Sequence, residues 1–111
     1  MSDAPNIGDV VLEVHYPGDP SRAVRLSETP FLIGRSGADN HLQLTDPRIS
    51  RQCAAILWGD GQFHLEDRGH RRGIFVNGKK IQRHALRDGD VITFGLDDSH
   101  QIIFRSSAAD T

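Results

Sequence analysis

The sequence contains a single cysteine, Cys53, so no disulfide can form within the chain. It has no apolar run approaching the roughly 20 residues that cross a bilayer, and its first residues lack the pattern of a secretory signal peptide. These absences predict a reducing, cytoplasmic setting. A membrane is therefore not expected among the partners of this protein.

An excess of positive charge is also missing. Thirteen Lys and Arg residues stand against fifteen Asp and Glu residues, which gives a formal net charge of −2. Nonspecific nucleic-acid binding depends on a broadly basic surface, so a nucleic acid is not an expected partner. Any site that binds an anion must be built locally.

Catalytic and metal-binding motifs are absent as well. The chain has no G-x-S-x-G, no P-loop lysine and no H-E-x-x-H. Its six histidines lack paired metal-ligand spacing, and its aspartates do not follow the order of an EF-hand calcium loop. The sequence therefore predicts no enzyme, and it calls for no cofactor and no metal.

What the sequence does contain is a series of short β-favouring runs separated by turn residues. Several alternate apolar and polar residues, which is typical of antiparallel strands with one face on a core. Gly59-Asp60-Gly61 and Asn77-Gly78 tolerate the positive φ angles of tight turns and predict two β-hairpins. An all-β sandwich or barrel follows, with strands expected at residues 10–14, 23–26, 31–33, 41–44, 53–58, 63–66, 74–76, 91–94 and 101–104.

The length of 111 residues allows one domain with a single core. Residues 1–9 show no periodicity and are expected to form a flexible leader. Residues 106–111 are small and polar, and we interpret them as a tail or the start of a linker. The expected domain spans residues 10–105, as a module of a longer chain.

Three motifs lie on these runs: FLIGRSG from Phe31, RISRQCA from Arg48 and LEDRGHRRGIFVNG from Leu65. LRDGDVITFG follows from Leu86. In this order and spacing they resemble the phosphate-reading face of a forkhead-associated (FHA) domain, over roughly two thirds of the chain. The resemblance implies a two-sheet antiparallel β-sandwich of FHA type, with ligand-binding loops at one end.

The first two motifs supply candidate ligand contacts. Arg35 follows an apolar strand, and its planar guanidinium fork matches phosphate oxygens two at a time. Ser50 lies in a loop where a hydroxyl and backbone amides can converge on an oxyanion. The resemblance implies that Arg35 and Ser50 contact the phosphate and that Arg51 supports the loop or meets the peptide. Cys53 replaces a histidine that braces this loop in the family, and we expect it in the core.

The third motif departs most from the family pattern. His70, Arg71 and Arg72 stand where the family has two hydroxyl residues and an asparagine. An amide both donates and accepts hydrogen bonds, whereas a guanidinium only donates, so Arg72 weakens the expected grip on a peptide backbone. The loop gains charge instead, because Arg68 is also nearby and His70 adds more below about pH 6.5.

These residues favour a non-catalytic module that mediates protein–protein interaction in kinase signalling by binding a phosphothreonine segment of a partner protein. Further domains of the same chain are also candidate partners. Two alternatives stay open: a phosphate-independent interaction domain with a degenerate site, and a binder of another anion such as a nucleic-acid backbone or a phosphoinositide. The residues expected to bind the phosphopeptide are Arg35, Ser50, Arg51, His70, Arg71 and Arg72.

Overall fold

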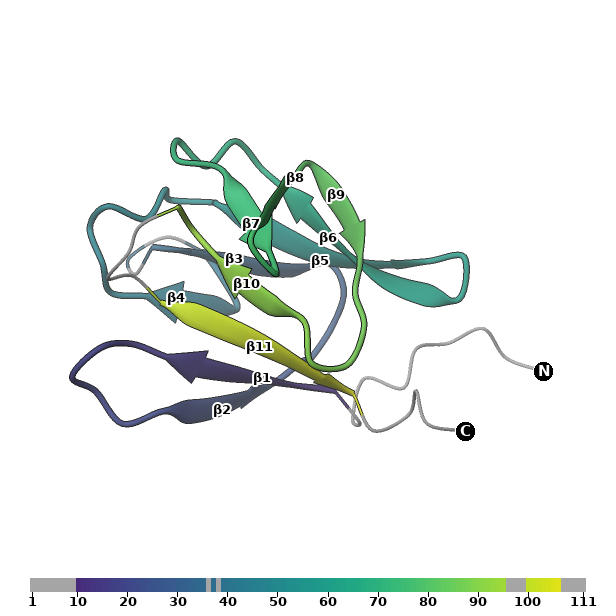
Figure 1. The fold of residues 1–111 in the computed structure, drawn as a ribbon, viewed down its shortest axis with the longest axis horizontal. Coiled ribbons are helices and arrows are strands. Elements are labelled where there is room, and N and C mark those ends of the chain that lie inside the picture. The colour runs from purple at the N-terminus through teal and green to yellow at the C-terminus, as the bar shows by residue number, and fades with distance from the viewer. Residues whose placement is uncertain (1–9, 36, 38, 96–99, 107–111) are drawn as a thin grey trace.

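A computed structural model describes residues 10–35, 37, 39–95 and 100–106. The expected leader at residues 1–9 and residues 107–111 of the expected tail lie outside the described residues. The chain forms two β-sheets packed face to face, as Figure 1 shows. The predicted all-β, two-sheet sandwich is confirmed.

The first sheet has the strand order β2-β1-β11-β10-β7-β8. The strands in this order are Arg22–Arg25, Val10–His15, Gln101–Ser106, Val91–Thr93, Ile74–Val76 and Lys79–Ile81. Every neighbouring pair is antiparallel. The long pairing of β1 with β11 joins the two ends of the described chain.

The second sheet has the strand order β4-β3-β5-β6-β9. These strands are Leu42–Leu44, Phe31–Arg35, Ala54–Gly59, Gln62–Asp67 and Arg83–Ala85. The sheet is antiparallel except for β3 and β4, which run parallel in the register Ile33↔Leu42. Both strands therefore point toward the same edge, so the loop after β4 begins on the side of the molecule where β3 ends.

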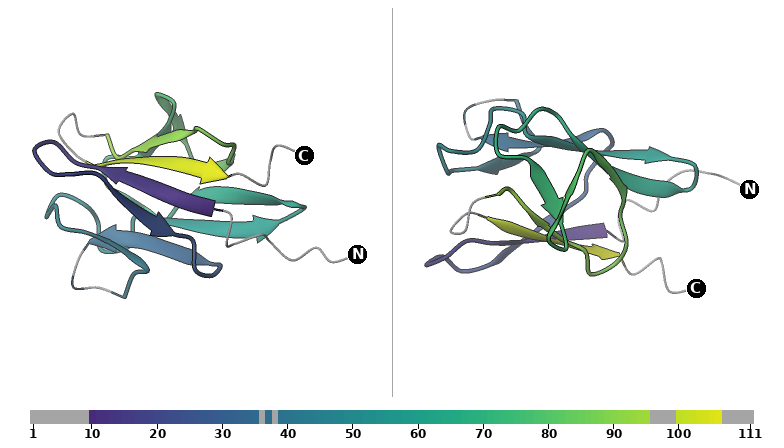
Figure 2. Two further views of the ribbon diagram at one scale, coloured as in Figure 1. Left: turned by 90° about the horizontal axis from the view of Figure 1, so that it is seen from below. Right: turned by 45° about the horizontal axis from the view of Figure 1, so that its top comes forward.

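The core lies between the sheets, which the left view of Figure 2 presents as two layers. Alternation places it there: in β1 every second residue is buried, and in β6 Phe63 and Leu65 are buried between more exposed neighbours. The expected burial of Cys53 is confirmed, and burial raises the pKa of its thiol to about 12. The largest fully buried side chains include Phe31, Phe94, Phe104, Leu12, Ile33 and Ile56.

Both expected hairpin turns are present. Asp60 and Gly61 have φ angles of 54° and 75° between β5 and β6, and Asn77 and Gly78 have 51° and 85° between β7 and β8. The charged strands β8 and β9 were not expected from the sequence. Each lies at the edge of its sheet, where lysine and arginine discourage pairing with other chains.

Asp90 joins the later strands through its carboxylate. Oδ1 accepts a hydrogen bond from Asn77 Nδ2 at 2.9 Å, while Oδ2 accepts one from the Arg87 amide at 2.9 Å and lies 3.0 Å from His84 Nε2. Asn77 also accepts a bond from the Val91 amide at 3.0 Å. These bonds hold the Asn77-Gly78 turn against the segment from Arg87 to Val91.

Candidate functional site

Ser50 is the residue at which three loops meet. Its carbonyl accepts a hydrogen bond from the Arg35 amide at 3.1 Å, which ties the β4–β5 loop to the end of β3. Its hydroxyl lies 2.9 Å from His70 Nδ1 and accepts a bond from the Arg71 amide at 3.3 Å. Arg35, Ser50 and Arg71, which the sequence predicts as site residues, are therefore brought together by backbone and hydroxyl contacts.

Gly34 allows the β4–β5 loop to come close to β3. A Cβ at this position would overlap the backbone carbonyl of Arg51 and lie 2.7 Å from Asn40 Nδ2. That Nδ2 donates hydrogen bonds to the Arg51 carbonyl at 2.7 Å and to the Arg35 carbonyl at 3.3 Å. In the Gly-Arg motif, Gly34 thus gives the β4–β5 loop room to pack against β3. Arg35 follows it, half-buried, at the end of the strand.

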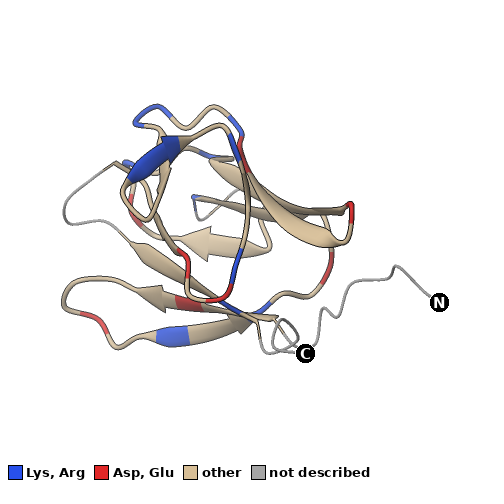
Figure 3. Cartoon of the chain, turned by 45° about the vertical axis from the view of Figure 1, so that its right-hand side comes forward, with Lys and Arg blue, Asp and Glu red and all other residues tan. Residues whose placement is uncertain are grey.

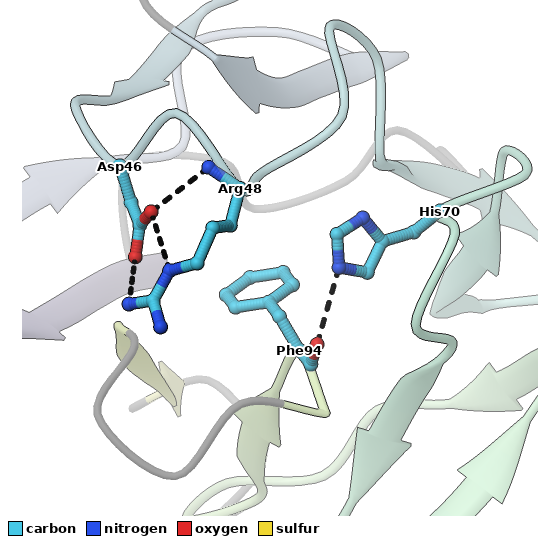
Figure 4. A network of polar contacts seen from close by, with 4 residues as sticks. All are labelled: Asp46, Arg48, His70 and Phe94. Atoms are coloured by element: carbon cyan, nitrogen blue, oxygen red, sulfur yellow. Dashed lines mark hydrogen bonds and ion pairs between the residues drawn. The ribbon is translucent and has the colours of Figure 1, made fainter.

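Asp46 braces the β4–β5 loop where the loop begins. The carboxylate is 3% exposed, and it accepts hydrogen bonds from the amide and Nε of Arg48 through Oδ1 and from the same guanidinium through Oδ2. Figure 4 shows these hydrogen bonds between Asp46 and Arg48. The hydrogen bonds from the Arg48 side chain hold the pKa of Asp46 below its usual value. The loop that carries Ser50 therefore enters the site with a fixed turn.

Asp67 shapes the third loop, between β6 and β7. Its Oδ1 accepts hydrogen bonds from the amides of Gly69 and His70 at 2.8 and 2.9 Å. The loop closes where the Gly73 amide donates to the His70 carbonyl at 3.0 Å. These bonds turn the His70 side chain inward, while Arg71 and Arg72 are exposed.

His70 lies inside the protein, only 4% exposed, although the sequence predicts it among the peptide-binding residues. Nε2 is 3.1 Å from the carbonyl oxygen of Phe94, and the ring meets the Phe94 ring edge-on. Burial lowers the pKa of His70, and the Phe94 carbonyl and Asp67 oppose this effect only in part. The extra positive charge expected below about pH 6.5 is therefore displaced to lower pH in the free protein.

Four of the predicted arginines belong to the segments that meet at Ser50. Arg35, at the end of β3, is half-buried, and Arg51, Arg71 and Arg72 are exposed. None of the four forms an ion pair within the part of the chain that the structure describes. Arg68 differs, since its Nε lies 2.8 Å from Glu66 Oε1.

A further cation, Lys80, lies beside the third loop. The Lys80 side chain on β8 crosses Gly73, where an added Cβ would lie 2.8 Å from its Cε. Figure 3 shows Lys and Arg segments gathered in the upper part of the view, on β8 and the neighbouring loops. Although the whole chain has a formal net charge of −2, these loops form a locally cationic surface that suits an anion.

Sequence reasoning missed three residues that position the site: Asn40, Asp46 and Asp67. Each uses a polar side chain to satisfy backbone groups of a loop. The Asp46-Pro47 and Asp67-x-Gly69 patterns are signals for such turns, because aspartate readily bonds to amides two or three residues further on. Asn40 carries no comparable local signal, since its partner Arg51 comes from another loop.

A family model for the FHA domain matches residues 31–95, which is more than half of the chain. This chain belongs to the FHA domain family. The matched segment contains all three loops around Ser50, so the family membership rests on the region that forms the site.

Individual relatives agree with this assignment. The chain is 30% identical over 99 residues to the ABC transporter ATP-binding/permease protein Rv1747 of Mycobacterium tuberculosis, a match that covers 85% of this chain and 10% of that protein. The chain thus spans about a tenth of the length of this curated relative.

Solved FHA domains have the same fold. The FhaA FHA domain, crystallised with the intracellular domain of Rv3910, is 33% identical with a TM-score of 0.73, covering 86% of this chain and 99% of that one. A structure from a study of phosphothreonine-dependent FHA domain interactions is 30% identical with a TM-score of 0.71, covering 86% and 95%.

Proposed function

We propose that this FHA domain binds a phosphothreonine-containing segment of a partner protein and thereby mediates protein–protein interaction in kinase signalling. The observation that carries the proposal is the meeting of three loops at Ser50, with Arg35 and Arg71 beside it. The FHA family membership and the relative studied for phosphothreonine-dependent interactions support it.

The chemistry of the loops suits a phosphate monoester. A phosphate adds a charge of about −1.5 to −2 and three strong acceptor oxygens. The Arg35 guanidinium supplies a pair of parallel donors, and Arg71 and Arg72 supply further charge. We infer that Arg35, Ser50 and Arg71 contact the phosphate, that Arg51 and Arg72 flank the peptide, and that His70 acts from behind Ser50.

We further propose that residues 10–105 form the recognition unit, that it acts in the cytoplasm and that it is not itself an enzyme. The core and the site lie within these residues. The described residues contain no helix long and apolar enough to span a membrane. Other domains of the same chain remain candidate partners, because the matched transporter protein is about ten times longer than the matched segment.

The test is a binding assay with an oriented library of phosphothreonine peptides, followed by titration of a selected peptide and its unphosphorylated form. We expect the phosphorylated peptide to bind at least about a hundredfold more tightly, since the charge-assisted contacts are lost without the phosphate. A phosphoserine version of the same peptide measures the preference for threonine.

Two other outcomes point to different functions. Equal binding of both peptides would overturn the proposal in favour of a phosphate-independent interaction domain, which the replacement of asparagine by Arg72 favours. If the domain instead binds anionic ligands with steep salt dependence and without selectivity for the peptide, it recognises a nucleic-acid backbone or a phosphoinositide.

A further inference from the structure

His70 contacts Ser50 from the interior of the domain. Its Nδ1 lies 2.9 Å from the Ser50 hydroxyl and 3.4 Å from the Ser50 amide, and its Nε2 lies 3.1 Å from the Phe94 carbonyl. The imidazole thus bridges the β4–β5 loop and the end of β10 (Val91–Thr93). Any change in its protonation therefore alters the hydrogen bond to the Ser50 hydroxyl, which is the group proposed to contact the phosphate.

The direction of each hydrogen bond follows from the chemistry of the partners. The Phe94 carbonyl can only accept, so Nε2 carries the proton and Nδ1 of the neutral ring is an acceptor. The Ser50 hydroxyl therefore donates its single proton to Nδ1, while its oxygen accepts the Arg71 amide. In the free protein this proton points inward, toward His70.

A bound phosphate requires the opposite arrangement. The oxygens of a phosphate dianion only accept hydrogen bonds, so the Ser50 hydroxyl must donate its proton outward to contact one of them. With neutral His70 this turn would leave two acceptors, Nδ1 and the hydroxyl oxygen, facing each other. A proton on Nδ1 removes the conflict, because the imidazolium then donates to Ser50 and Ser50 donates to the phosphate.

We propose that His70 is a positioning residue that couples phosphate binding to the uptake of one proton. On binding, a proton from the solvent adds to Nδ1 of His70, and the Ser50 hydroxyl turns its own proton from Nδ1 to the phosphate. Nδ1 then donates to the hydroxyl oxygen and gives up the long 3.4 Å hydrogen bond that it accepts from the Ser50 amide in the free protein. The inference rests on the proposed phosphothreonine function and specifies how that site responds to pH.

The groups around His70 allow this exchange. Burial lowers the pKa of the imidazole in the free protein, and the charge of Arg72 on the same loop lowers it too. Asp67 at the end of β6 and the Phe94 carbonyl at the end of β10 act in the opposite direction. A phosphate dianion beside Ser50 adds a further negative charge. Burial therefore favours neutral His70 without ligand, and the phosphate favours the protonated ring.

The decisive experiment is calorimetric titration of a library-selected phosphothreonine peptide in two buffers of different ionisation enthalpy, between pH 6.5 and 8. The wild type should take up as much as one proton per complex, so its affinity should fall by up to about tenfold per pH unit as the pH rises. The phosphate itself titrates with a second pKa of about 6. If the domain binds only its dianion, binding releases protons, which is opposite in sign to the uptake expected for His70.

The matched control is His70→Asn, whose amide oxygen can still accept the Ser50 proton but does not titrate in this range. Its binding should show no proton uptake and a flat affinity above pH 6.5. Uptake of the same size in the variant would overturn the inference, because the proton would then bind elsewhere.

Nitrogen-15 NMR of the wild type keeps the inference testable even if the variant does not fold. The free protein should show neutral His70 with the proton on Nε2, and the complex should show the imidazolium. Peptide binding with His70 still neutral would reject the inference and leave the proposed function intact. Failure of every phosphorylated peptide to bind would instead reject the proposed function, and the inference with it.

Discussion

Arg35 is the residue on which the proposed phosphate contact depends most. Its amide is fixed by the Ser50 carbonyl, and its guanidinium has no competing ion pair within the described residues. We expect Arg35→Ala to weaken phosphopeptide binding roughly 30- to 1,000-fold, since a bidentate charge-assisted contact is worth about 2–4 kcal/mol. Titration calorimetry and a thermal melt, which should change little, check this.

The control for Arg35 is Arg105→Ala. Arg105 pairs with Glu13 on the β1–β11 ribbon at 3.0 Å, and this exposed pair contributes little to stability. Arg105→Ala removes the same charge as Arg35→Ala, but from the β1–β11 ribbon. We therefore expect it to change the affinity for the phosphopeptide by no more than about twofold. A loss below threefold for Arg35→Ala would show that another group anchors the phosphate.

Gly34 lies where the Arg51 backbone leaves no room for a side chain. We expect Gly34→Ala to lower the free energy of unfolding by about 1–3 kcal/mol, because the new Cβ must displace the Arg51 backbone. Urea denaturation measures this. Gly59→Ala is the matched control, since nothing lies within 4 Å of its added Cβ. Equal effects of both substitutions would contradict the close loop packing described for Gly34.

At the scale of elements, the β6–β7 loop carries exposed charge that the family pattern lacks. Arg72→Asn removes one positive charge and restores an amide. We expect the variant to bind phosphopeptide with similar affinity but with a shallower salt dependence, because one fewer cation faces the phosphate. Titrations at two salt concentrations, with Arg105→Asn as a control for charge alone, measure the slope.

A different result for Arg72→Asn would change the interpretation of the loop. An unchanged salt slope together with markedly tighter binding would mean that Arg72 impairs the site. In that case the wild-type domain would be better described as a phosphate-independent interaction module.

Asp90 connects several elements through its carboxylate. Burial alone raises the pKa of Asp90, but hydrogen bonds from the Arg87 amide, Asn77 and His84 outweigh it, so the pKa is lowered. The folded state therefore gains stability above the unfolded pKa of about 3.9, and that gain is lost as the pH falls from about 4 through the folded value.

We expect Asp90→Asn to cost about 2 kcal/mol of unfolding free energy at pH 7 and to flatten the loss of stability below pH 4. Chemical denaturation from pH 2.5 to 7 measures both effects. Asp60→Asn, at the exposed β5–β6 turn, should change neither. If Asp90→Asn loses stability below pH 4 as steeply as the wild type, the pH dependence comes from other carboxylates. Asp46 is then the first candidate, because its pKa is also lowered.

At the scale of the whole molecule, the sandwich separates stability from recognition. The core lies between two sheets, and the loops at Ser50 place cations beside it without burying them. A chain with a formal net charge of −2 can thus present a cationic surface at one place. Long-range attraction is weak for such a molecule, and recognition depends on contacts within about 10 Å, the screening length at moderate salt.

Much of the fold could be predicted from local patterns. Alternation in β1 and β6 and the Asp60-Gly61 and Asn77-Gly78 turns depend on neighbouring residues only, so the sequence predicts them correctly. Strands β8 and β9 escaped prediction because Lys79, Lys80 and Arg83 are charged, and edge strands do not need the apolar alternation of a buried strand. The parallel pairing of β3 and β4 depends on the path of the loop between them.

The sequence by itself determined the all-β class, the turns and the identity of the arginines and serine in the three loops, because these follow from short-range chemistry. Only the tertiary structure decided what those residues face. Ser50 meets His70 across 20 positions of sequence, and His70 meets Phe94 across 24. Such contacts form when distant loops pack together, and the packing placed His70 inside the domain, behind the hydroxyl it is inferred to control.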